Sequence, residues 1–139
     1  MDTDAERAAR TVARLARVLE CALGGGTLPQ YRVLAAVDDG GERATHLASC
    51  LALAKPTVTA AVDGLVDRGY LQREPVPNDR RSTRIALTPL GRKMLAEAEE
   101  AMAENLTAVV QGADDPAAVL SLLATLGPVL ENRPVGARQ

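Results

Sequence analysis

Apolar residues recur at helical spacing over most of the chain, which predicts a mainly helical protein. A first helix is expected from about Asp4 to Leu23, where three consecutive glycines end it. A second helix should begin with Thr27 as its N-cap and end at a run of two aspartates and two glycines. A third should start near Thr45, and a fourth should carry Pro56 in its first turn, where proline is tolerated.

The pattern changes from helical to extended after the fourth helix. Residues 70–74 and 84–87 predict two short strands. Residues 75–82 between them contain proline, asparagine and aspartate, and predict an arginine-rich turn. The segment as a whole therefore predicts a β-hairpin.

Two further helices are expected after the hairpin, over residues 88–111 and 116–130. The last one is apolar around much of its circumference, as in helices that pack against another chain. Together with the first helix, these segments are too apolar to be exposed on a monomer of this size. We therefore expect residues 1–27 and 93–139 to form a helical region that makes a homodimer.

The net charge of −2 hides an uneven distribution of charges. Residues 42–93 hold nine basic and five acidic side chains, a net charge of +4. Residues 94–139 hold two basic and seven acidic side chains, a net charge of −5. Because a polyanion responds to the local field of a surface, the weakly acidic total does not argue against nucleic acid as a partner.

Residues suited to metal binding or catalysis are scarce. The single histidine, His46, and the two cysteines, Cys21 and Cys50, have no usual zinc-site spacing, so no metal or cofactor is expected. We expect both cysteines to pack as small hydrophobes. The sequence offers no nucleophile and base pair and no phosphate-binding glycine loop, so no enzyme activity is expected. No run approaches the about 20 apolar residues that span a bilayer, so we expect a cytoplasmic protein.

The sequence resembles the multiple antibiotic resistance regulator (MarR) family over nearly its whole length. Six groups of residues carry the resemblance, and the last two are the most specific. They are Gln30-Tyr31-Arg32-Val33-Leu34; Leu47-Ala48 with Leu51; Pro56-Thr57-Val58-Thr59 with Val62 and Leu65; Arg68-Gly69-Tyr70-Leu71 with Arg73; Asp79-Arg80-Arg81; and Leu87-Thr88-Pro89-Leu90-Gly91. The resemblance implies a winged helix-turn-helix DNA-binding domain over residues 28–92. It also implies a homodimeric repressor that binds a pseudo-palindromic operator in double-stranded DNA and is released by a small-molecule effector.

The fourth predicted helix has a face suited to the major groove, which is about 12 Å wide and admits a helix with short side chains. Lys55 lies at its start, and Thr57 and Thr59 can hydrogen-bond base edges or phosphates. The first turns of this face lack Arg, Asn and Gln. Base discrimination is therefore expected from thymine-methyl contacts to Ala60 or Ala61, from water, or from DNA shape.

The tip of the predicted hairpin carries Arg80, Arg81 and Arg84, with Asp79 able to pair with one of them. The resemblance implies that an arginine of this wing enters the minor groove, where narrow A·T-rich stretches concentrate negative potential. We predict Arg81 for this role, with Arg80 as the alternative; the competing interpretation is a solvated charged turn. The predicted DNA-binding set is Lys55, Pro56, Thr57, Thr59, Ala60, Arg68, Arg73, Asp79, Arg80, Arg81 and Arg84.

Relatives in this family bind small effectors in a cleft that usually includes aromatic side chains. Here Tyr31 is the aromatic candidate, because Tyr70 begins the wing, and Arg17 of the first helix is a weaker candidate. The alternative function is a helical interaction module whose winged fold binds protein instead of DNA. The basic charge around the wing argues against that alternative, and a steep salt dependence of DNA affinity would discriminate the two.

Overall fold

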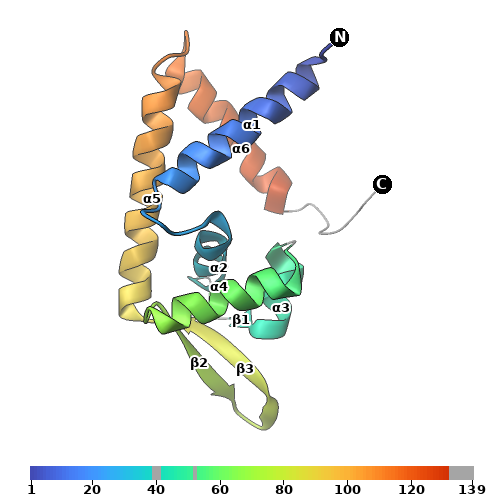
Figure 1. The fold of residues 1–139 in the computed structure, drawn as a ribbon, viewed down its shortest axis with the longest axis vertical. Coiled ribbons are helices and arrows are strands. Elements are labelled where there is room, and N and C mark those ends of the chain that lie inside the picture. The colour runs from blue at the N-terminus through green and yellow to red at the C-terminus, as the bar shows by residue number, and fades with distance from the viewer. Residues whose placement is uncertain (39–41, 52, 132–139) are drawn as a thin grey trace. The chain divides into compact units, whose positions relative to one another are not determined.

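The computed structural model describes residues 1–38, 42–51 and 53–131 (Figure 1). In chain order its elements are α1 (Asp4–Cys21), α2 (Leu28–Asp38), β1 (Glu42–Arg43), α3 (Ala44–Leu51), α4 (Lys55–Asp67), β2 (Leu71–Val76), β3 (Asp79–Leu87), α5 (Pro89–Val110) and α6 (Pro116–Glu131). They divide into a central unit of residues 27–98 and a terminal unit of residues 1–26 with 99–131. These elements confirm a mainly helical chain with an antiparallel β-hairpin.

Several element boundaries differ from the prediction. α1 ends at Cys21 instead of Leu23, because the following turn contains Gly24 and Gly25 at positive φ. Cys21 is exposed, so the expectation that it packs as a small hydrophobe is wrong; the side chain of Cys50 lies outside the described residues. The strand β1 was not predicted, since two residues are too few to show an alternating pattern.

The predicted start of α2 is confirmed by two reciprocal hydrogen bonds. The Thr27 hydroxyl accepts the Gln30 backbone N–H, and the Gln30 side-chain oxygen accepts the Thr27 N–H, both at 3.2 Å. This capping box satisfies amides that have no partner within the helix. From the same helix, the Arg32 guanidinium donates to the carbonyl of Leu51 at 2.6 Å and so ties α2 to the end of α3.

The core of the central unit joins α2, α3 and α4 to the base of the hairpin. Its largest fully buried side chains are Val33, Val37, Leu47, Leu65, Leu71 and Ile85. Strand β3 lies between β1 and β2, and pairs antiparallel with both. The near end of the hairpin is thus part of the core, while its far end extends beyond the three helices of the unit (Figure 1).

Two groups of residues that carried the family resemblance meet where the hairpin joins α5. The Thr88 hydroxyl donates to the Gly69 carbonyl at 2.5 Å and accepts the Gly91 N–H at 3.0 Å. The Thr88 N–H donates to the Tyr70 carbonyl at 3.1 Å. A Cβ atom at Gly91 would lie 2.0 Å from that same carbonyl oxygen, so only glycine fits there. The two groups therefore fix the direction in which α5 leaves the hairpin.

Replacing Thr88 by valine should lower the free energy of unfolding by about 1–2 kcal/mol, because the helix loses its capping oxygen and Gly69 loses a hydrogen-bond donor. Urea denaturation followed by circular dichroism measures the change. Thr107→Val is the matched control, because Thr107 is exposed on the same helix. Equal stability of the two variants would show that the Thr88 hydroxyl does not hold this junction.

The terminal unit contains α1, the second half of α5 and α6, and buries little within one chain. Among its described residues the one buried hydrophobic side chain is Val110. Its exposed large apolar side chains, apart from the first residue of the chain, are Val12, Val109, Leu122, Leu126, Val129 and Leu130. None of the described helices is both long enough and apolar enough to cross a membrane.

Candidate nucleic-acid interface

Helix α4 turns one face into the core and the other to solvent. Val58, Val62 and Leu65 are buried, whereas Thr57 and Thr59 are exposed. The helix therefore presents short polar side chains outward because its branched apolar side chains anchor the opposite face. Of the predicted outward set, Lys55, Pro56, Thr57, Thr59 and Ala60 are all exposed.

The structure adds two details about this face of α4. Ala61 is buried at 5% exposure, so it cannot contact a thymine methyl group, and Ala60 is the alanine that faces solvent. Gly64 lies near a neighbouring helix, because a Cβ there would lie 3.4 Å from the side-chain nitrogen of Gln30. Gly64 thus marks the place where α4 passes close to α2.

The N-terminus of α4 lacks a side-chain cap. Ala54 occupies the cap position with extended backbone and makes no side-chain cap hydrogen bond. Lys55 and Pro56 follow as the first two residues of the helix. Unpartnered amides at a helix N-terminus carry partial positive charge, so this end can accept an anionic group such as a phosphate.

The hairpin is longer than predicted and its turn is tighter. The strands enclose only Pro77 and Asn78, and Asn78 has a positive φ of 65°. The register pairs Pro75 with Thr83 but the next residue, Val76, with Asp79, so residues 80–82 have no counterpart in β2. Proline has no N–H to continue the ladder, which is the physical reason for an irregularity at this point. The predicted turn over 75–82 is therefore wrong in length.

The arginines of the wing occupy different places from those predicted. Arg80 and Arg81 belong to β3 and not to the connecting turn, and their side chains lie outside the described part of the structure. Arg84 lies opposite Glu74 in the middle of the ladder, so it is not at the tip. Asp79 is half-buried at the start of β3.

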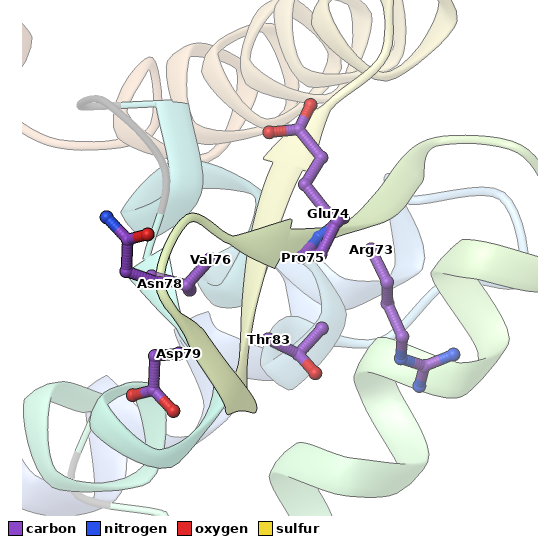
Figure 2. Close-up of a pocket in the computed structure, with 7 residues that line it drawn as sticks. All are labelled: Arg73, Glu74, Pro75, Val76, Asn78, Asp79 and Thr83. Atoms are coloured by element: carbon purple, nitrogen blue, oxygen red, sulfur yellow. The ribbon is translucent and has the colours of Figure 1, made fainter.

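Because successive side chains of a strand point to opposite faces, the remaining charged side chains lie on two faces of the hairpin. Arg73 is opposite Ile85 on the face that continues the core, and its guanidinium forms an ion pair with Asp63 of α4. Figure 2 shows Arg73 and Glu74 pointing to opposite sides of β2. On the Glu74 side, Arg84 and Arg92 line a second hollow together with Asp38. The hairpin thus separates the predicted DNA-binding arginines Arg73 and Arg84.

The hollow drawn in Figure 2 lies along the far half of the hairpin. It has a volume of about 620 Å³ and is lined by Arg73, Glu74, Pro75, Val76, Asn78, Asp79 and Thr83. Sequence reasoning did not identify Asp63, which pairs with Arg73 of this lining. Nothing in the spacing of Asp63 and Arg73 indicates their contact, because it depends on how the hairpin packs on the helix.

The other predicted site residues lie elsewhere. Arg68 is exposed and forms the C-terminal cap position of α4, at the opposite end from Lys55. Tyr31 is half-buried and packs against the core of the central unit. Arg17 belongs to the terminal unit, where its exposed guanidinium pairs with Glu20 at 3.4 Å.

Comparison with known proteins places this architecture in a family. A model of the MarR family matches residues 25–82, which include α2 to α4 and most of the hairpin. The transcriptional repressor CouR, solved bound to a 23-mer DNA duplex, is 31% identical with a TM-score of 0.71, and the match covers 89% of this chain and 92% of CouR.

Two other solved structures extend the comparison. BpsR from Bordetella bronchiseptica, whose DNA binding is regulated by 6-hydroxynicotinic acid, is 25% identical with a TM-score of 0.70, over 91% of this chain and 97% of that one. Wild-type MarR from E. coli in its apo form is 22% identical with a TM-score of 0.75, over 92% and 99% of the two chains, and shares the fold. The chain therefore belongs to the MarR family of winged helix transcriptional regulators.

Proposed function

We propose that this protein is a homodimeric repressor that binds a pseudo-palindromic operator and leaves it when a small molecule binds. The observation that carries the proposal is the exposed face of α4, whose side chains are short. This face begins at an N-terminus without a side-chain cap, beside Lys55. The DNA-bound structure of CouR, a repressor 31% identical to this chain, supports the same role here.

In this proposal α4 enters the major groove with its N-terminal half. The first-turn amides and Lys55 bind a phosphate, and Thr57 and Thr59 reach base edges or neighbouring phosphates. Ala60 contacts a thymine methyl group. Because this face has no side chain that can bind a base in bidentate fashion, part of the specificity comes from DNA shape. Arg68, at the other end of α4, contacts a backbone phosphate.

The homodimer rests on the apolar surface of the terminal unit. Leu122, Leu126, Val129 and Leu130 follow one another at helical spacing on α6, and each is about half exposed or more. A single small domain rarely exposes so many large apolar side chains together, and a second copy of the chain would cover them. Two copies related by a two-fold axis would present two α4 helices to successive major grooves, about 34 Å apart.

Release by a small molecule is proposed from the family and from BpsR, whose DNA binding 6-hydroxynicotinic acid regulates. Tyr31 of the central unit is our candidate for a contact to the effector, and Arg17 of the terminal unit is a separate, weaker candidate. The test of the whole proposal is a binding titration with a fluorescent DNA fragment from upstream of the protein's own coding region, at two salt concentrations and with competitor DNA. Tight, salt-sensitive binding that resists competitor supports it. Binding that competitor removes entirely, both here and in a selection from random DNA, would favour a protein-binding role.

We expect Arg81→Ala to weaken operator binding about 10- to 100-fold and to reduce the salt dependence by about one released ion, because one cation leaves the DNA-facing wing. Fluorescence anisotropy at several salt concentrations measures both quantities. Arg92→Ala is the matched control, since Arg92 is an exposed arginine on α5, outside the hairpin. The mass of the assembly should not change. If only Arg80→Ala lowers the affinity, Arg80 is the minor-groove residue; if neither substitution does, the wing has no role in binding.

A further inference from the structure

The ion pair between Asp63 and Arg73 joins the two elements that the proposed function places on DNA. Asp63 lies on α4, and Arg73 lies on β2 at the near end of the wing. The side chain of Asp63 is 55% exposed and that of Arg73 is 46% exposed. A pair this exposed adds little to the stability of the fold. We therefore expect the ion pair to act mainly on the relative geometry of α4 and β2.

The other described support of the wing lies near its base, where β3 also pairs with β1 at Ile85 and Arg84. Its near end is held by the buried side chains of Leu71 and Ile85 and by the hydrogen bonds of Thr88 to Gly69 and Tyr70. From Arg73 onward, the hairpin borders the hollow of about 620 Å³ shown in Figure 2, and the described residues that line this hollow all belong to the hairpin. Among the described residues, the Asp63–Arg73 pair is the side-chain polar contact that joins α4 to β2.

We propose that Asp63 and Arg73 are positioning residues that set the angle of the wing relative to α4, so that both elements reach DNA together. This inference rests on the proposed function and deepens it. Arg73 acts through Asp63, and its guanidinium is committed to that carboxylate instead of a phosphate. Because the ion pair fixes the wing before binding, less conformational entropy is lost when DNA binds.

The charge of Asp63 and its positioning role predict opposite changes in DNA affinity when its carboxylate is removed. Asp63 is a negative charge on the face that meets a polyanion, so its removal by itself should tighten DNA binding. If the carboxylate positions the wing, its removal should instead weaken binding to a specific site. Asp63→Asn separates the two roles because asparagine keeps the shape and loses the charge.

The experiment measures affinity for a fluorescein-labelled duplex selected from a random pool by the wild-type protein, with a random duplex of equal length beside it. We expect Asp63→Asn and Arg73→Gln each to weaken the selected duplex about fivefold, within the range of coupling between contacting residues. The double variant should be no weaker than Arg73→Gln alone. Asp63→Glu should restore binding to within about twofold, since it keeps the charge.

Asp67→Asn is the matched control, because Asp67 is exposed one turn later on α4 and forms no ion pair among the described residues. It should leave affinity unchanged or raise it. Circular dichroism should show all variants folded. Tighter binding by Asp63→Asn, or losses that add in the double variant, would overturn the positioning role and make Arg73 a direct phosphate contact. If the wild-type protein does not distinguish the two duplexes, the proposed function fails and this inference fails with it.

Discussion

Gly91→Ala is expected to lower the free energy of unfolding by at least about 3 kcal/mol. The new Cβ would lie 2.0 Å from the Tyr70 carbonyl oxygen and 2.9 Å from its carbon. Both are backbone atoms, so no side-chain rotation can relieve the contact. The Thr88 hydrogen bonds to Gly69 and Tyr70 hold that backbone in place from the other side.

Urea denaturation followed by circular dichroism measures this loss, and operator binding should fall with it because the start of α5 and the wing share this junction. Gly112→Ala is the matched control. Gly112 does not have a positive φ, and a Cβ there would lie 3.6 Å from the Val109 carbonyl oxygen, an ordinary contact. A Gly91→Ala variant as stable as this control would show that the junction can rearrange, and our explanation of the glycine would be wrong.

The double variant Leu122→Glu with Leu126→Glu is expected to make the protein monomeric and to weaken operator binding by about 100-fold or more. The two leucines are 68% and 49% exposed within one chain, so the substitutions should not disturb its own core. In the proposed dimer they would bury unpaired carboxylates, which is strongly unfavourable. A monomer also loses the second half-site, whose contribution arises from the high effective concentration within a dimer.

Light scattering gives the mass, and anisotropy with the selected duplex gives the affinity. Ala124→Glu adds a single glutamate to the same helix, two residues from each leucine and so on the far side, and should remain dimeric. Retention of the dimer by the double variant would mean that a different surface joins the two copies. Loss of the dimer without loss of DNA affinity would instead separate dimerisation from operator binding.

Local signals in the sequence were sufficient for most elements of the fold. Thr27 before Gln30, Thr88 before Pro89 and the proline at 116 each marked a helix start that the structure contains. These signals work because a capping hydroxyl and the fixed φ of proline act within a few residues. The buried face of α4 was likewise predictable at Val58, Val62 and Leu65, since helical periodicity alone places them together.

The candidate site was less predictable, because its parts are joined by packing. The sequence indicated that arginines follow the helix-turn-helix, but it placed Arg84 at the tip, whereas the ladder puts it opposite Glu74. It offered Ala60 or Ala61 as the contact to a thymine methyl group, and the packing of α4 places Ala61 in the core.

The sequence by itself determined the helical periodicity, the helix caps, the net positive charge of residues 42–93 and the family motifs of this protein. Only the tertiary structure decided the length and register of the hairpin, the pairing of Asp63 with Arg73, and the fit of Gly91 against Tyr70. The physical reason is the distance along the chain over which each kind of interaction acts. Caps and periodicity depend on residues within one or two helical turns, whereas the register and the contacts between α4 and β2 depend on how whole elements pack around a shared core.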